Sequence, residues 1–261
     1  MAAPASSSRM WKSVHALAWA AELGCRRIIP YLPGAFSPSM DREFRLMVRK
    51  VCPYTVSSIA RMHALYQGVQ RIVKTPVPGD VVECGVWRGG SMMLAAETLA
   101  ACGDRTRKIF LYDTFRGMSE PSEKDVTFYG FSAHEKWAWN KTDRYNRWFY
   151  APLSEVRQNM EKTAYPSGQF VYVQGNLLEP LPQASPSRIA LLRIDVDFYS
   201  ATRRALELFY PRLVRGGVLL MDDYGHWKGA RQAADDFFET LGESIPAFQK
   251  VDYSGVVAVK E

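Results

Sequence analysis

The sequence predicts an α/β fold, a doubly wound, mostly parallel seven-stranded sheet with helices on both faces. Short apolar segments alternate with helical segments along residues 80–260, which is the order of consecutive βα units. Some of these segments, such as Val218–Met221, are apolar at every position. Continuous apolarity is typical of strands buried on both faces, so the sheet is expected to lie between two layers of helices.

The same patterns place the individual elements. Strands are expected at 80–84, 108–112, 170–174, 189–194, 217–221, 247–251 and 256–259, the last two as a closing hairpin. Helices are expected between them at 91–101, 153–163, 202–210 and 229–241. A further helix is expected at 57–73, where apolar residues recur on one helical face until Pro76 and Pro78 end it.

A chain of 261 residues suits one large domain with a modest extra segment. We divide it into an N-terminal helical extension, 1–55, and a main domain, 56–261. Charged residues interrupt the apolar stretch 11–29, so it fits neither a membrane span nor a signal peptide. An amphipathic helix that packs on the body or on a second subunit is expected, which favours a homodimer; attachment to a membrane surface is the alternative.

Composition narrows the compartment and the partners. The four cysteines are widely spaced with no CxxC pair, which argues against a zinc site or a disulfide framework and favours the reducing cytoplasm. The net charge is +6, but the basic residues are scattered among acidic ones and form no run of five. A mildly basic, solvated surface is therefore expected, with no nucleic-acid partner.

A glycine-rich turn follows the first strand of the main domain. Within Val81–Ser91, Gly85 allows a tight turn, and Gly89 and Gly90 allow a ligand to approach the start of the next helix. The spacing matches neither the phosphate-binding GxxxxGK[ST] loop nor the dinucleotide-binding GxGxxG motif. By itself the turn predicts a nucleotide-like ligand at a βα crevice.

Asp113 ends the next strand. A carboxylate at this position can accept hydrogen bonds from both hydroxyls of a ribose, which would narrow the ligand to one that contains that sugar. The alternative is that Asp113 caps the backbone that follows it.

Acidic residues follow two further strands. Asp195 and Asp197 come after one strand, and Asp222 and Asp223 end the next. Carboxylates that converge at one edge of a sheet repel each other unless a cation neutralises them, and an all-oxygen ligand set suits Mg²⁺. The alternative is that they cap helices or pair with the nearby arginines Arg193, Arg203 and Arg231.

The segment 119–150 fits no strand and is too long for an ordinary loop. It is rich in aromatic residues and contains His134. Long loops in compact domains are often lids, so we expect a lid-like insertion over the substrate, with a packed structural excursion as the alternative. His134 and His226 are candidate bases because imidazole titrates near neutrality, although a lone histidine is more often structural.

At these residues the chain resembles the macrocin O-methyltransferase family, metal-dependent enzymes known for methylating sugar hydroxyls in macrolide antibiotics. The matching blocks occur in order and together are specific. They are Ser57–Gln67, Val77–Ser91, Leu111–Pro121, Leu192–Tyr199, Tyr210–Leu213 and Asp222–Trp227.

The resemblance implies a class I methyltransferase fold, S-adenosylmethionine as methyl donor and Mg²⁺ as helper. The expected activity is methyl transfer to a hydroxyl of a sugar or other small natural product. The expected donor-binding residues are Glu83, Gly85, Val86, Gly90, Ser91, Asp113 and Arg116; the metal ligands are Asp195, Asp222 and Asp223; and the catalytic residues are Asp195, His226 and His134. The alternatives are a non-catalytic donor-binding or assembly protein and a nicotinamide-dependent dehydrogenase, for which the GxGxxG motif is missing.

Overall fold

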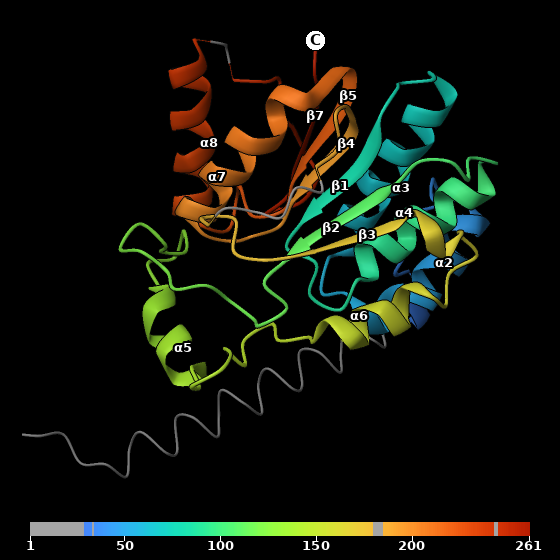
Figure 1. The fold of residues 1–261 in the computed structure, drawn as a ribbon. Helices are drawn as coiled ribbons and strands as arrows, with labels where there is room; N and C mark the ends of the chain where they lie inside the picture. The colour runs from blue at the N-terminus through green and yellow to red at the C-terminus, as the bar shows by residue number, and fades with distance from the viewer. Residues whose placement is uncertain (1–28, 33, 180–184, 243–244) are drawn as a thin grey trace, which may run out of the picture.

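The computed structural model describes residues 29–32, 34–179, 185–242 and 245–261. Its centre is a seven-stranded sheet with the strand order β3-β2-β1-β4-β5-β7-β6 (Figure 1). The first five strands in this order are parallel, and β7 and β6 are antiparallel to their neighbours. The predicted fold class is confirmed. The strand order reverses between β1 and β4, and ligands of open α/β sheets bind at such a switch point, outside the carboxyl ends of the strands.

The strands are short and, apart from the sheet edges, buried. Their bounds are β1 Asp80–Cys84, β2 Ile109–Asp113, β3 Phe170–Gln174, β4 Ile189–Ile194, β5 Leu213–Met221, β6 Gln249–Lys250 and β7 Val256–Val259. Two bounds differ clearly from the expected ones: β5 begins earlier and β6 has only two residues. Both residues of β6 are exposed because this strand is the sheet edge, and a short edge strand offers little backbone for unwanted pairing.

Successive strand residues point to opposite faces, and each face carries a layer of helices (Figure 1). Helices α2 Arg42–Val51, α3 Ile59–Lys74, α4 Gly90–Ala101 and α6 Leu153–Met160 cover one face; α7 Tyr199–Phe209 and α8 Lys228–Leu241 cover the other. Val81 of β1 belongs to the first apolar core and its neighbour Val82 to the second. The two cores hold the carboxyl ends of β1, β4 and β5 in fixed positions.

The extension predicted at the N-terminus lies partly outside the described residues. Within them, α2 packs into the first core: Phe44 is fully buried and its ring contacts His63 and Tyr66 of α3. Asp41 caps α2 and also accepts a hydrogen bond from the Tyr66 hydroxyl, 2.9 Å away. Residues 41–51 are therefore integrated with the main domain. No described helix is long and apolar enough to cross a membrane.

The segment predicted as a lid-like insertion contains one helix, α5 Ala133–Asn140, which stands apart from both helical layers beyond the carboxyl ends of the strands (Figure 1). A third apolar cluster fixes it, in which Trp137 and Trp148 pack with Phe198 and Trp227. Trp137 also donates a hydrogen bond to the Met118 carbonyl, 3.0 Å away. The insertion is packed structure at the ligand-binding end of the sheet.

Candidate active site

Gly85 lies where the ends of β1 and β4 meet. Its φ is +84°, and a Cβ at this position would lie 1.8 Å from the carbonyl oxygen of Asp195. A left-handed φ and this close approach both require glycine. The predicted tight turn is present, and Gly85 brings the glycine-rich turn against the first residue of the acidic rim, by which we mean Asp195, Asp197, Asp222 and Asp223.

The Asp113 carboxylate holds this turn in place. Its Oδ2 accepts hydrogen bonds from the backbone N–H groups of Val86, at 2.7 Å, and Trp87, at 3.0 Å. Oδ1 accepts from the N–H of Phe115 at 2.7 Å. Burial nevertheless raises the pKa of Asp113, against the effect of these donors. The capping alternative therefore describes what Asp113 does here, and the residue as a whole is half-buried.

The other predicted donor-binding residues occupy different environments. Gly90 starts α4. A Cβ at this position would lie 2.6 Å from the Tyr54 carbonyl, so glycine is required here for the close packing of α4 against Tyr54. Ser91 is buried in the first turn of α4. Val86 is buried in the turn itself, and the Arg116 side chain is exposed. The structure thus joins Val86 to Asp113, places Ser91 at the start of α4 and leaves Arg116 exposed.

Glu83 was expected beside the donor, yet it is fully buried within β1 and pairs with Arg193 of β4. No described residue donates to its second carboxylate oxygen, Oε2. Burial raises the pKa of Glu83 to about 8, although the Arg193 charge acts in the opposite direction. In the described contacts, Glu83 holds the Arg193 side chain in place through an ion pair.

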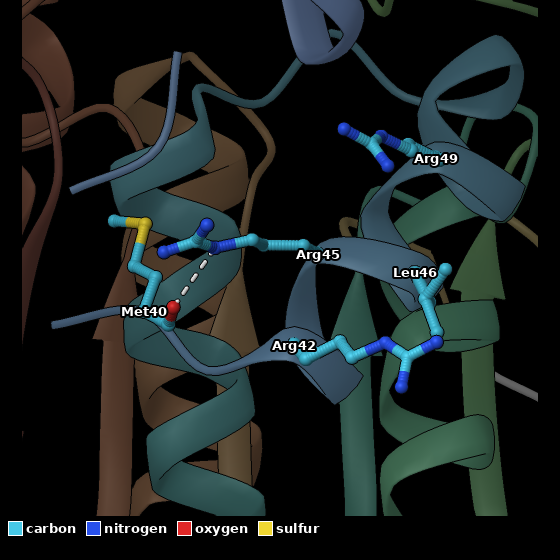
Figure 2. A pocket seen from close by; sticks show the side chains of 5 residues that line it. All are labelled: Met40, Arg42, Arg45, Leu46 and Arg49. Atoms are coloured by element: carbon cyan, nitrogen blue, oxygen red, sulfur yellow. Dashed lines mark hydrogen bonds between the residues drawn. The ribbon is translucent and has the colours of Figure 1, made fainter. Parts of the chain in front are cut away.

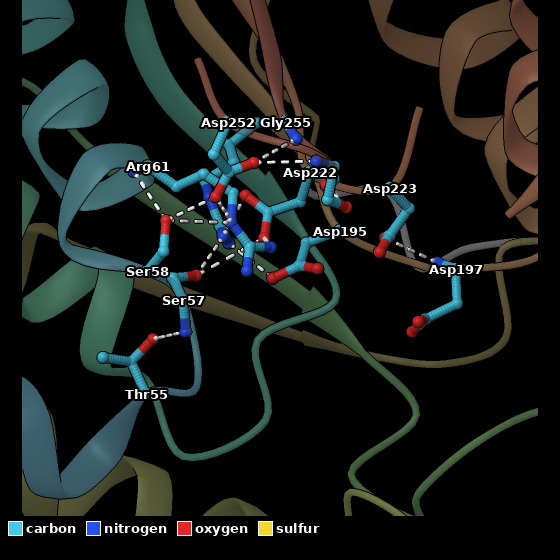
Figure 3. Close-up of polar contacts among 12 residues, drawn as sticks. Thr55, Ser57, Ser58, Arg61, Asp195, Asp197, Asp222, Asp223, Asp252 and Gly255 are labelled. Atoms are coloured by element: carbon cyan, nitrogen blue, oxygen red, sulfur yellow. Dashed lines mark hydrogen bonds and ion pairs between the residues drawn. The ribbon is translucent and has the colours of Figure 1, made fainter. Parts of the chain in front are cut away.

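Arg193 of β4 contacts two carboxylates of the acidic rim. Its Nη1 lies 2.8 Å from Oδ2 of Asp195, and its Nη2 donates to Oδ1 of Asp222 at 2.6 Å and to the Ser57 hydroxyl at 2.8 Å (Figure 3). The alternative that the rim acids pair with nearby arginines therefore holds for this one arginine. Arg203 instead pairs with Glu207, and Arg231 lies over the rings of Phe128 and Tyr224.

Sequence reasoning missed a second arginine at the rim. Arg61 of α3 pairs with Oδ2 of Asp222 and, through Nε, with Asp252 at 3.1 Å (Figure 3). Arg61 lies within a block that carries the family resemblance, but nothing in its spacing relates it to residue 222. Asp252 was missed for the same reason: it lies in a turn near the C-terminal end of the chain, and nothing in its spacing relates it to the rim.

The other three rim carboxylates are compensated less fully than Asp222. Among the described residues, Asp195 forms an ion pair with Arg193 alone, at 2.8 Å, Asp197 accepts from the Trp227 indole, and Asp223 accepts from the N–H of Asp197. Burial and mutual repulsion raise the pKa of Asp195 to about 6 and of Asp197 to about 7, and they raise the pKa of Asp223 as well. The pKa of Asp222 is lowered despite its burial because two arginines face it. The rim holds an excess of negative charge.

The predicted Mg²⁺ ligands Asp195, Asp222 and Asp223 all belong to the acidic rim. In the described part of the chain, no group of three or more His, Cys, Asp or Glu side chains is arranged to hold a metal ion. The donor chemistry fits, because all three side chains are carboxylates and a carboxylate paired with arginine still has acceptor capacity. Binding would therefore require these side chains to change their orientation.

The two candidate bases lie on different elements. His226 is half-buried in the turn after β5, and its ring packs against Trp227 and Tyr253. His134 is exposed in the first turn of α5. His226 is thus three residues from the rim acid Asp223, whereas His134 belongs to the insertion.

The insertion also contacts the segment that follows β5, a link that the sequence did not indicate. Thr127 forms a β-bridge with Trp227, and the Trp227 indole donates a hydrogen bond to Oδ1 of Asp197 at 2.8 Å. Asp197 adopts a left-handed φ of +60°, and its N–H donates to Asp223 at 3.1 Å. The insertion is therefore linked to Asp197 through Trp227.

A surface hollow elsewhere contains none of these residues. Met40, Arg42, Arg45, Leu46 and Arg49 line it, on α2 and its approach (Figure 2). Arg45 donates to the Met40 carbonyl at 2.9 Å, and Arg49 lies over the Tyr31 ring. Arg45 and Arg49 thus already serve local packing, and the candidate site remains the switch point.

Comparison with known proteins identifies related O-methyltransferases. The chain is 34% identical over 203 residues to an 8-demethyl-8-(2,3-dimethoxy-alpha-L-rhamnosyl)-tetracenomycin-C 4'-O-methyltransferase of Streptomyces olivaceus, which covers 78% of this chain and 74% of the relative. It is 31% identical over 206 residues to demethyldecarbamoylnovobiocin O-methyltransferase of Streptomyces niveus, with the same coverage.

A solved structure shows the same architecture over nearly the whole chain. The O-methyltransferase NovP superposes with a TM-score of 0.70 at 25% identity and covers 94% of this chain and 98% of its own. The model of the macrocin-O-methyltransferase family matches residues 40–260, a range that includes the glycine-rich turn, the acidic rim and the insertion between them. This chain therefore belongs to the macrocin-O-methyltransferase family and is an O-methyltransferase.

Proposed function

We propose that this O-methyltransferase transfers the methyl group of S-adenosylmethionine to a hydroxyl of a sugar or other small natural product, with Mg²⁺ as helper. The observation that carries the proposal is the junction at Gly85. A turn that suits a nucleoside-containing donor and a rim of carboxylates that suits a hydroxylated acceptor meet there, at the switch point of the sheet.

Two features of the crevice suit the donor. The N-terminus of α4 favours a carboxylate such as that of the methionine moiety, because the first N–H groups of a helix carry partial positive charge. The sulfonium and ammonium groups of the donor are cationic, and the excess negative charge of the acidic rim attracts them. Gly85, Val86, Ser91 and Asp113 are the proposed donor contacts, and Glu83 supports them through β1.

The reaction is a displacement at the methyl carbon. The acceptor oxygen forms a bond to that carbon while the carbon–sulfur bond breaks, and the hydroxyl proton passes to a base. The donor is already activated, so the protein mainly aligns the two substrates. His226 is the proposed base because it is half-buried beside the rim; Asp195 and His134 are the other catalytic candidates.

Asp195, Asp222 and Asp223 are the residues that would hold Mg²⁺. A divalent cation there would neutralise the repulsion that raises the pKa values of Asp195 and Asp223, and it would lower the pKa of the acceptor hydroxyl. A cytoplasmic location and assembly into a homodimer accompany the proposal as predictions from the sequence.

The acceptor class is inferred from the relatives and from the insertion. The relatives that methylate a rhamnosyl-tetracenomycin and a novobiocin precursor act on natural products. The insertion presents Phe128, Tyr129, Phe131 and Trp139 at its surface, which are aromatic rings able to contact a ring-containing acceptor.

The proposal is tested with the double variant D222N/D223N. It should abolish turnover of hydroxylated acceptors while binding of S-adenosylhomocysteine, measured by calorimetry, persists. The matched control is D235N/D236N, which removes two adjacent carboxylates from α8 that bond to Tyr224 and Tyr199. Full activity of D222N/D223N, or of the wild type in excess EDTA, would contradict the metal role. Donor binding by the wild type without turnover of any acceptor would favour a non-catalytic protein.

A further inference from the structure

Asp222 is held from two layers of the fold. Arg193 of β4 reaches its Oδ1 from within the sheet. Arg61 reaches its Oδ2 from α3, in the helical layer (Figure 3). The Asp222 side chain is 6% exposed and that of Arg61 is 11% exposed. Two guanidinium groups on opposite oxygens fix both the position and the rotation of the carboxylate, because each guanidinium is planar and directional.

Arg61 is itself fixed by the turn between β6 and β7. Its Nε lies 3.1 Å from Oδ2 of Asp252, and the Ser58 hydroxyl donates to the same oxygen at 2.5 Å. Oδ1 of Asp252 accepts from the N–H groups of Ser254, at 2.9 Å, and Gly255, at 2.7 Å. These backbone donors, the Ser58 hydroxyl and the Arg61 charge lower the pKa of Asp252 despite its burial.

The same turn also contacts the backbone of the rim and the Arg61 side chain. The Ser254 hydroxyl donates to the backbone carbonyl of Asp222 at 2.5 Å. Gly255 packs directly on the Arg61 side chain: a Cβ there would lie 2.7 Å from Cδ and 2.8 Å from Cγ of Arg61. These atoms belong to the middle of a side chain that is tied at its end to two carboxylates, so Arg61 has little freedom to move away.

We propose that Arg61 is a positioning residue for methyl transfer, which aims the Asp222–Asp223 segment of the acidic rim and is itself set by the turn Asp252–Gly255. The inference rests on the proposed function, since it assigns Arg61 a role in that reaction. Arg61 acts through Asp222 and is separate from the donor-binding turn. Arg61 would have this role toward Asp222 as a proposed metal ligand, and removal of such a partner of a metal ligand typically lowers metal affinity or activity by about 10–100-fold.

The first experiment compares R61K and R61A with the wild type under saturating donor. R61A should lower kcat at least about 10-fold, with the KM for the donor and the affinity for S-adenosylhomocysteine unchanged. R61K should recover part of kcat, because lysine keeps the charge but cannot bridge two carboxylates with one fork. The matched control is R107K. Arg107 is also largely buried and paired with Asp104 at 2.7 Å, but it bonds to the Gly79 carbonyl before β1, at the opposite end of the strands.

A double-mutant cycle shows whether the turn acts through Arg61. G255A leaves every charge in place and adds one methyl group against the arginine side chain, so it should lower kcat in the wild-type background. In the R61A background the atoms that the methyl group meets are gone, and G255A should change kcat less than about twofold. Contacting residues show such non-additivity, whereas independent sites do not.

The outcomes separate clearly. Unchanged kcat in R61A would overturn the positioning role. So would a loss of kcat that equals the loss in the fraction of protein able to bind S-adenosylhomocysteine. Additive effects of R61A and G255A would overturn the link to the turn. If R61A does not fold, G255A and R61K carry the test, since a structural role alone would lower the melting temperature without lowering kcat. The absence of turnover by the wild type would instead contradict the proposed function.

Discussion

At the scale of single residues, two glycines with nearly the same φ show what the active site demands. Gly85 has a φ of +84° and would place a Cβ 1.8 Å from the Asp195 carbonyl, whereas Gly103 has a φ of +80° and nothing within 4 Å. Both conformations favour glycine, but only Gly85 stands where two strand ends meet. Conformation and close approach can therefore be separated experimentally.

We expect G103A to lower the free energy of unfolding by about 1 kcal/mol, the cost of a left-handed alanine. G85A should cost that amount plus about 1–3 kcal/mol, because β1 and β4 must also separate. Urea unfolding measures both values, and calorimetry should show weaker binding of S-adenosylhomocysteine for G85A alone. An equal decrease in the free energy of unfolding for the two substitutions would show that the close approach of β1 and β4 at Gly85 adds no energetic penalty.

At the scale of elements, the insertion is a separately packed unit beside the rim. Its helix α5 buries Trp137, which is 7% exposed, and leaves Trp139, two residues later, 41% exposed. Trp137 joins the cluster that also contains Trp148 and Trp227. Because Trp227 bonds to Asp197, the packing of α5 connects to the rim without contributing to the two main cores.

W137A should therefore loosen the insertion and spare the sheet. We expect faster trypsin cleavage between residues 119 and 150, because removal of a buried tryptophan typically costs about 3–5 kcal/mol of packing. The KM for the acceptor should rise, while the affinity for S-adenosylhomocysteine stays within about twofold, since the donor turn lies outside this cluster. W139A on the same helix serves as control for protease sensitivity alone, because Trp139 is one of the exposed rings proposed to contact the acceptor. Equal protease sensitivity of the two variants would show that α5 is held by other contacts.

At the scale of the whole molecule, the buried charges link stability to pH. Glu83 lies at the centre of the sheet, and its pKa is raised to about 8 from a usual value of 4.5. A carboxyl group whose pKa is higher in the folded state binds protons more readily there. Its contribution to stability is complete below pH 4.5, falls as the pH rises toward 8, and is constant above that value.

E83Q removes this contribution. The difference in unfolding free energy between the wild type and E83Q should decrease steadily between about pH 4.5 and 8 and then level off. Urea midpoints measured across this range provide the test. The control is E123Q, which changes an exposed glutamate in the insertion. A difference that increases with pH would mean that pairing with Arg193 outweighs burial and that the pKa of Glu83 is lowered.

The sequence alone determined the sheet, the glycine-rich turn and the positions of the rim acids, because continuous apolarity, glycine spacing and strand ends are local properties. Val218–Met221 could be recognised as a buried strand from its own residues. The tertiary structure decided how the charges pair. Arg61 meets Asp222 across 161 positions, and Asp113 turns to the backbone of Val86 and Trp87. Such contacts form only when separate strands and helices pack together. The partners are far apart in the sequence, so no local pattern can relate them.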